Sequence, residues 1–287
     1  MRLTRRRAAE DIGGTRPVTL APLTVLELSP PELVACAAEA GYDGVGLRLI
    51  RATDEEPVRP TIGQTPVIRE TRRRLDDTGL FVLDVEVLRL RPDTDVRRDF
   101  GGVLETAAYL GATQALVTGN DREHSRLADN LAELADIAAE FGIRPNLEPM
   151  PWTEVRNLAE ATAILQRCQD GAGVLVDALH YDRELATPDD LHALPSEWIS
   201  YVQICDGLSP RPTAVDELRY QGRNARLFPG EGGIDLTGML RALPDVPVSI
   251  EAPVQWPAPA GVRARAALRA ARTVVGRADA SRLPLSA

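Results

Sequence analysis

The sequence contains no lysine, because all 33 residues of its combined lysine and arginine count are arginine. A lysine amine is needed for a Schiff base with a carbonyl substrate and for the attachment of a pyridoxal cofactor. Both imine routes to sugar and keto-acid chemistry are therefore closed to this chain.

Cysteine and long apolar runs are also scarce. The three cysteines, Cys36, Cys168 and Cys205, are too few and too scattered for a disulfide framework or a cysteine-rich zinc cluster. No apolar run approaches the roughly 18 to 20 residues that a membrane span needs. The arginines near the N-terminus have no apolar stretch behind them, which argues against a secretion signal. We expect a protein of the reducing cytoplasm that does not associate with membranes.

Basic charge is lacking as well, since the formal net charge is −9 and the sequence pI is about 5.0. A nucleic-acid-binding protein normally carries a basic footprint, so we expect no nucleic-acid partner. Hydrophobic residues make up 44% of the 287 residues, which is enough for a sizeable core. Barrels of alternating strands and helices commonly reach this length as a single domain.

Apolar runs alternate with helix signals along the chain. The run at 18–28 precedes Ser29 and Glu32, a capping-box start for a helix that ends at Gly41. Seven more such units follow, with strands at 44–50, 80–88 and 112–119 and strands ending at 148, 177, 203 and 251, and with helices at 65–79, 95–111, 121–142, 154–168, 188–194, 236–243 and 260–275.

Eight strand-then-helix units predict the α/β class and a single closed (β/α)8 barrel, a TIM barrel, over residues 18–277. No GxGxxG motif follows the first strand, which disfavours an open doubly wound sheet. We expect a flexible N-terminal arm at 1–17 and a flexible tail at 278–287.

Four of the later strands end in side chains that can bind a metal ion: Glu148, Asp177, Gln203 and Glu251. Packing does not require such residues at the ends of buried strands, and these ends meet at one face of a barrel. Ion pairing of Glu148 and Glu251 with arginine is the structural alternative. The oxygen-rich set predicts one divalent metal ion, Mn²⁺ or Mg²⁺, with Co²⁺ and Zn²⁺ as alternatives.

The segments that carry these residues resemble the xylose isomerase-like superfamily of sugar isomerases and epimerases, over nearly the whole chain. They are Asn146-Leu147-Glu148-Pro149, Val176-Asp177-Ala178-Leu179-His180, Val202-Gln203-Ile204-Cys205-Asp206, Phe228-Pro229-Gly230-Glu231-Gly232-Gly233-Ile234-Asp235 and Ser249-Ile250-Glu251. The resemblance implies that Glu148, Asp177, Gln203 and Glu251 are the metal ligands. It also implies that His180 and Arg226 contact a small polyhydroxylated substrate, and that two copies of the barrel pair as a homodimer.

The resemblance implies a metal-dependent isomerase or epimerase that works through an enediolate, with Glu148, Glu251 and His180 as catalytic residues. Gln203 departs from the histidine that many sugar epimerases of the superfamily have there. Because 3-dehydroshikimate dehydratases have glutamine at this position, a metal-dependent dehydratase is the alternative reaction. The rivals of other classes are a ligand- or partner-binding barrel without catalysis and a metal-dependent nuclease, which three histidines and an acidic pI disfavour.

Three further residues are candidates for contact with substrate. Arg48 ends the second strand and suits either a carboxylate or phosphate clamp or a salt bridge. Glu86 on the third strand is likewise a candidate either for contact with substrate or for a salt bridge. Trp152 lies four residues beyond Glu148, where it either walls the pocket or covers the start of a helix. The segments 51–64 and 208–226 are the loops expected over the pocket.

Overall fold

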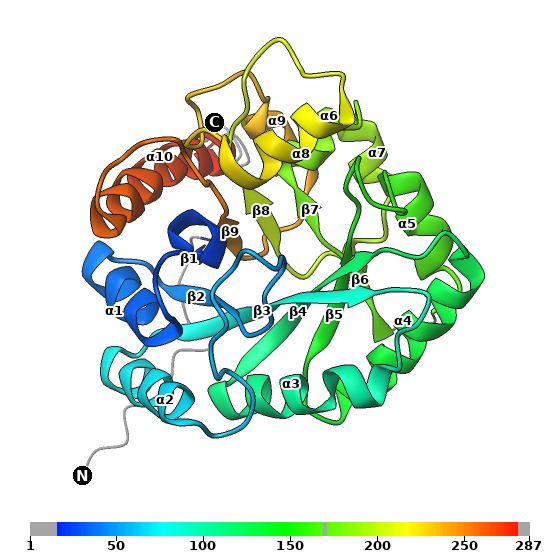
Figure 1. The fold of residues 1–287 in the computed structure, drawn as a ribbon. Coiled ribbons are helices and arrows are strands. Elements are labelled where there is room, and N and C mark those ends of the chain that lie inside the picture. Colours follow the sequence, from blue (N-terminus) through cyan, green and yellow to red (C-terminus); the bar gives the residue numbers. More distant parts are fainter. Residues whose placement is uncertain (1–15, 169–170, 281–287) are drawn as a thin grey trace, which may run out of the picture.

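The strands form a closed ring of parallel neighbours (Figure 1). The computed structural model describes residues 16–168 and 171–280. The strands are β1 (Val18–Leu20), β2 (Gly44–Arg48), β3 (Phe81–Leu90), β4 (Ala112–Gly119), β5 (Arg144–Glu148), β6 (Gly173–Val174), β7 (Val176–Asp177), β8 (Val202–Ile204) and β9 (Val248–Ile250). Their order is β6-β5-β4-β3-β2-β1-β9-β8-β7. Only Leu175 separates β6 from β7, so these two are halves of one interrupted strand and the ring has eight positions. The predicted TIM barrel is confirmed.

Helices surround this ring, as the outer positions of α1 to α4 and α10 in Figure 1 show. They are α1 (Pro30–Ala40), α2 (Pro66–Thr78), α3 (Val96–Leu110), α4 (His124–Ala139), α5 (Leu158–Leu165), α6 (Ala178–Arg183), α7 (Pro188–His192), α8 (Val215–Asn224), α9 (Leu236–Ala242) and α10 (Ala260–Ala280), with 3-10 turns η2 (Pro22–Val25) and η4 (Ser196–Trp198). Within the described ranges no helix is both long enough and apolar enough to cross a membrane.

Local signals in the sequence set several helix ends. The predicted capping box at the start of α1 is present, with the backbone amide of Ser29 donating to Glu32 at 2.8 Å. Gly41 ends this helix at a φ of 90°, a left-handed conformation that glycine adopts without a steric penalty. Thr65 caps α2 by accepting a hydrogen bond from the amide of Ile68. These ends depend on neighbours in sequence, which is why the sequence predicts them well.

Two helices lie outside the predicted set. The helix α6 has only six residues and begins directly after β7, and α8 lies within the segment 208–226 that we expected to be a loop. Only Leu218, Gln221 and Gly222 of α8 are buried, so its sequence has too few apolar positions to produce a clear helical period.

The predicted boundaries of the barrel shift at both ends. The helix α10 continues to Ala280, past the expected end at residue 277, because Ala278 is fully buried against the core. Arg16 and Pro17 are buried as well, and the Arg16 guanidinium donates to the carbonyl of Leu240. The remainder of the predicted arm and tail, residues 1–15 and 281–287, lies outside the described residues.

The core has two parts. The larger one fills the space between the strands and the helices. The smaller one has six members on the strand face away from the helices and so lies inside the barrel: Phe81, Leu83, Val87, Leu116, Leu175 and Tyr201. The hydroxyl of Tyr201 donates to Asp84 at 3.2 Å. This apolar interior gives the polar residues at the strand ends a rigid floor.

Glu184 joins α6 to α5, because its carboxylate accepts a hydrogen bond from the amide of Leu158 at 2.7 Å. Burial raises the pKa of Glu184 from 4.5 to about 8. The folded state therefore holds this proton more tightly than the unfolded state does. The stability that results is complete below about pH 4.5 and is lost as the pH rises through about 8.

We predict that Glu184→Gln flattens the dependence of the melting temperature on pH between pH 5 and 8.5. The neutral amide still accepts the Leu158 hydrogen bond but has no charge to bury, so the variant should melt above the parent at pH 8.5. Circular dichroism melts across this range test the prediction, with exposed Glu133→Gln as the control. Parallel pH profiles for Glu184→Gln and the parent would contradict it.

Candidate functional site

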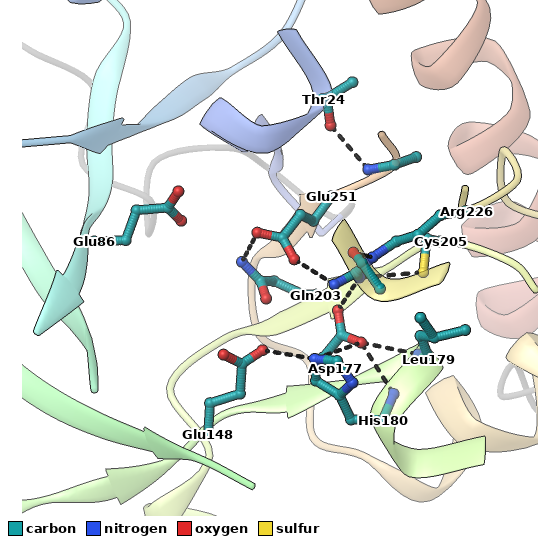
Figure 2. A network of polar contacts seen from close by, with 12 residues as sticks. Thr24, Glu86, Glu148, Asp177, Leu179, His180, Gln203, Cys205, Arg226 and Glu251 are labelled. Atoms are coloured by element: carbon teal, nitrogen blue, oxygen red, sulfur yellow. Dashed lines mark hydrogen bonds and ion pairs between the residues drawn. The ribbon is translucent and has the colours of Figure 1, made fainter. Parts of the chain in front are cut away.

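The carboxyl ends of the strands bring the four predicted ligand residues together. Glu148 is the last residue of β5, Asp177 the last of β7, and Gln203 the middle residue of β8, while Glu251 follows β9 directly. Each is at most 4% exposed. Asp177 and Gln203 are paired across β7 and β8, so their side chains lie at the same level. Figure 2 shows the four side chains gathered around His180 and Arg226.

Asp177 uses both of its carboxylate oxygens in the protein. Its Oδ1 atom caps α6 by accepting from the amides of Leu179 at 2.9 Å and His180 at 3.1 Å. Its Oδ2 atom contacts the Arg226 guanidinium at 2.6 Å. Burial alone would raise the pKa of Asp177, but Arg226 and His180 hold it below its ordinary value. Asp177 is therefore an anion that also fixes the first turn of α6.

His180 lies in that first turn, where its ring faces the carboxylates. Its Nε2 atom is 3.5 Å from Oε1 of Glu148 and 3.7 Å from Oδ1 of Asp177. Its ring and the Trp152 indole form a T-shaped contact with a centroid distance of 4.8 Å. Burial lowers the pKa of His180 to about 4, so the imidazole is neutral at pH 7. Its Nδ1 atom has no hydrogen-bond partner among the described residues.

Arg226 bridges two of the predicted ligands. Its Nη1 atom lies 2.6 Å from Oδ2 of Asp177, and its Nη2 atom lies 2.8 Å from Oε2 of Glu251. The next residue, Leu227, exchanges two backbone hydrogen bonds with Asp206, just beyond β8, which holds the arginine over this end of the barrel. Arg226 lines the cavity as the resemblance implies, but its guanidinium already binds two carboxylates of the protein.

The site has more carboxylates than cations. Burial raises the pKa of Glu251 to about 7, although Arg226 opposes this shift. Burial, with the nearby Glu251 and Asp177, raises the pKa of Glu148 well above its ordinary value. The one guanidinium among these three buried carboxyl groups contacts Asp177 and Glu251, and the shortage of positive charge around Glu148 favours a bound cation.

The donor atoms suit a divalent metal ion. Glu148, Asp177 and His180 each offer a ligand atom, and these atoms lie within 4.8 Å of one another. Oε1 of Glu148 and Oε1 of Gln203 are buried and have no hydrogen-bond partner among the described residues. The amide nitrogen of Gln203 donates to Glu251 at 3.4 Å, which leaves the amide oxygen free to ligate. The structure adds His180 to the candidate ligands, a role that the sequence did not suggest for it.

A cavity of about 540 Å³ opens above these residues. Trp152 lines it, with its indole against Gly222 of α8, where a Cβ atom would come within 2.3 Å of the ring. Arg48 also lines it, but its guanidinium contacts Glu86 and Glu56, each at 2.7 Å. Arg48 therefore forms the salt bridge that was one of its two alternatives. Glu86 is fully buried and forms this salt bridge with Arg48, which is one of its two alternatives as well.

Arg89, Met150 and Arg223 are among the residues of the cavity wall that sequence reasoning did not single out. Arg89 lies on β3 beyond a shift in the pairing register between Val85 and Leu88, which breaks the alternation that a strand normally shows. Arg223 lies on the unpredicted helix α8. The sequence offered two signals, because Met150 comes two residues after Glu148 and Arg223 lies in the segment 208–226 that was expected over the pocket.

The closed parallel α/β barrel places the protein in the TIM-barrel class. Its buried cluster of carboxylates and a histidine lies at the carboxyl ends of the strands, which is the usual position of a site in this class. The chain belongs to the xylose isomerase-like TIM barrel family, whose family model matches residues 34–273.

Individual relatives agree with this membership. The chain is 31% identical over 230 residues to a 3-dehydroshikimate dehydratase of Pseudomonas aeruginosa, which covers 73% of this chain and 33% of that protein. It thus spans about a third of the length of this relative. It is 25% identical over 163 residues to an inosose isomerase of Bacillus licheniformis, covering 53% of this chain and 56% of that one. The crystal structure of the IOLI protein with a bound zinc atom superposes with a TM-score of 0.75 at 22% identity, covering 91% and 98% of the two chains.

We predict that Arg226→Leu lowers the free energy of unfolding by about 3–5 kcal/mol, because it leaves Asp177 and Glu251 buried without their cation. Arg219→Leu on the neighbouring helix is the matched control. Arg219 is exposed and pairs with exposed Asp216, so its loss should cost at most about 1 kcal/mol. Urea unfolding in EDTA measures both changes. Arg226→Lys should lose an amount of unfolding free energy between these two values. Equal losses for Arg226→Leu and Arg219→Leu would show that the buried ion pairs of Arg226 stabilise the fold no more than an exposed pair does.

Proposed function

We propose that the protein is an enzyme that uses one divalent metal ion to remove a proton next to the carbonyl group of a small polyhydroxylated ketone. The observation that carries the proposal is the buried group of Glu148, Asp177 and His180, whose ligand atoms lie within 4.8 Å of one another beside a cavity. The named relatives of the chain are a dehydratase and an isomerase, which supports an enzymatic role.

Glu148, Asp177, Gln203 and Glu251 would hold the ion, with His180 as a further donor. An oxygen-rich set favours Mn²⁺ or Mg²⁺, whereas a histidine ligand would favour Zn²⁺ or Co²⁺. The zinc atom of the structurally similar IOLI protein supports a site for a divalent ion. When bound, the ion supplies an electrophile that stabilises the negative charge of an enolate or enediolate.

Glu148 and Glu251 supply the proton transfers in this proposal. They reach the site from β5 and β9, three positions apart around the ring, so they approach a substrate from different sides. One carboxylate accepts the proton from carbon, and the other returns a proton to the opposite face, which gives epimerisation. Return of the proton to the neighbouring carbon gives isomerisation instead.

Dehydration is the second candidate reaction. It needs the same first proton transfer, followed by loss of a β-hydroxyl group that takes up a proton. His180 suits this step as a proton relay. The Nε2 atom of its neutral imidazole lies 3.5 Å from Glu148 and would take the proton that Glu148 removed from carbon, while Nδ1, which has no hydrogen-bond partner among the described residues, would give its proton to the hydroxyl group that leaves as water. Gln203, which the family resemblance associates with 3-dehydroshikimate dehydratases, and the 31% identity to such a dehydratase support this reaction.

We predict that protein freed of metal by EDTA binds one Mn²⁺ per chain. Asp177→Asn and Glu148→Gln should weaken binding at least about tenfold, because each removes an anionic oxygen. Gln203→His should retain the ion, since imidazole is also a good ligand. Calorimetry and metal analysis measure these effects, with exposed Glu133→Ala as the control. Unchanged metal content in a folded Glu148→Ala/Glu251→Ala variant would sink the metal site and favour a barrel that only binds a ligand or partner.

We also predict metal-dependent exchange of a substrate C–H proton with solvent. In D₂O, an active member of a panel of ketoses, inosose and 3-dehydroshikimate should acquire deuterium next to its carbonyl group, and Glu251→Gln should slow this exchange at least about 100-fold. Mass spectrometry and proton NMR detect the exchange. Shielded return of the same proton would hide it, so substrate deuterated at that carbon is run in parallel. Turnover with neither deuterium uptake nor a primary isotope effect, or turnover that survives EDTA, would contradict the enolate route.

A further inference from the structure

Two of the four arginines that line the cavity have no carboxylate partner. Arg48 and Arg226 form ion pairs with glutamate or aspartate. Arg89 instead donates only two long hydrogen bonds, to the carbonyl of Ala52 at 3.2 Å and to Oδ1 of Asn120 at 3.4 Å. The side chain of Arg223 has neither a hydrogen bond nor an ion pair with any residue in the described ranges. The cavity wall therefore carries two guanidinium groups that form no ion pair with a carboxylate in the described part of the chain, which leaves their charge available to an anionic ligand.

Partial burial of these two guanidinium groups in the cavity wall destabilises the protein when no anion is bound. Both are half-buried, and burial lowers the pKa of each, with Arg223 adding to the effect on Arg89. The nearest acidic groups of Arg223, Glu56 and Glu55, attract it only at longer range, and Glu56 already binds Arg48. An anionic ligand would remove this cost, because it supplies the missing negative charge.

The strand register places Arg89 in line with the candidate metal ligands. Arg89 on β3 is paired with Thr118 on β4, and Thr118 is paired with Glu148 on β5. Paired residues point to the same face of a sheet, and all three line the cavity. With neighbouring strands about 4.8 Å apart, the Cα atoms of Arg89 and Glu148 are separated by roughly 10 Å. A ligand of the size of one six-membered ring can therefore span the distance between the two groups.

Arg223 approaches the same space from α8. Its neighbour Gly222 lies against the indole of Trp152, and that indole meets the ring of His180. The contact brings α8 over the cavity, on the side of His180. Arg89 and Arg223 thus belong to different elements, a strand and a helix, that meet only in the folded barrel.

We propose that the substrate carries an anionic group, a carboxylate or a phosphate, which Arg89 and Arg223 bind while its carbonyl end faces Glu148 and His180. This inference rests on the proposed function and narrows its substrate to acidic hydroxyketones. Guanidinium groups suit both anions, because they donate paired hydrogen bonds in a plane. A neutral sugar would bury the two arginines without a partner and bind less well.

The first test compares probes that differ in charge. Calorimetry on the full chain with Mn²⁺ uses 3-dehydroshikimate as the carboxylate, D-allulose 6-phosphate as the phosphate, and D-allulose and inosose as neutral compounds. At least one anionic probe should bind about tenfold or more tightly than either neutral one, and higher salt should weaken it. The tighter anion identifies which group the site takes. Equal or tighter binding of the neutral compounds would overturn the inference.

The second test removes each arginine. Arg89→Gln and Arg223→Gln should each weaken the anionic probe about 10- to 100-fold and leave neutral probes unchanged. Arg219→Gln, an exposed arginine of α8 paired with Asp216, should bind like the parent. Melting temperatures and Mn²⁺ content confirm that the variants are folded and loaded, and Arg89→Lys should recover part of the affinity. Parent-like anion binding in both glutamine variants would refute the role of these arginines.

The design separates this inference from the proposed function. Shikimate has the carboxylate but no ketone, so its binding in EDTA depends on the arginines and not on a metal ion. If the parent binds shikimate through Arg89 and Arg223 but neither binds Mn²⁺ nor exchanges protons, the anion site stands and the proposed function fails. If the parent binds Mn²⁺ and exchanges protons of a neutral ketone, and if Arg89→Gln and Arg223→Gln leave the binding of the anionic probes unchanged, the proposed function stands and this inference fails.

Discussion

The ion pairs of Arg226 are the interaction on which the rest of the site depends. Burying Asp177 and Glu251 at the ends of two strands is costly unless a cation lies between them, and the guanidinium contacts both at less than 3 Å. Arg226 comes from the segment after α8, so the same contact holds that segment over the barrel. Glu148 has no such partner, and the metal ion of the proposed function would supply the cation that it lacks.

The arginines of the cavity divide into two pairs with different surroundings. Arg48 and Arg226 neutralise carboxylates of the protein and hold the wall of the cavity in place. Arg89 and Arg223 face the cavity without such partners. Because the chain has no lysine, every cation at this site is a guanidinium that stays charged and donates hydrogen bonds in a plane. In the proposed function, anion recognition falls to arginine and proton transfer to glutamate and histidine.

Much of the fold was predictable because its signals are local. Caps such as Ser29 and Gly41, and apolar runs such as 112–119, depend on residues close in sequence. The helices α6 and α8 were missed because the first is short and the second buries only three residues. The role of Glu86 stayed open in the sequence because a strand residue can face either an ion-pair partner or a ligand, and only the folded structure shows its ion pair with Arg48.

The sequence by itself determined the barrel and the four oxygen-bearing strand ends, because parallel strands that alternate with helices must bring their carboxyl ends to one face. Only the tertiary structure decided how the charges at that face are shared. Whether Arg226 meets Asp177, and whether Arg223 meets any carboxylate, depends on distances between elements far apart in the chain. Those distances follow from the closure of the ring and the position of α8, which no local pattern in the sequence encodes.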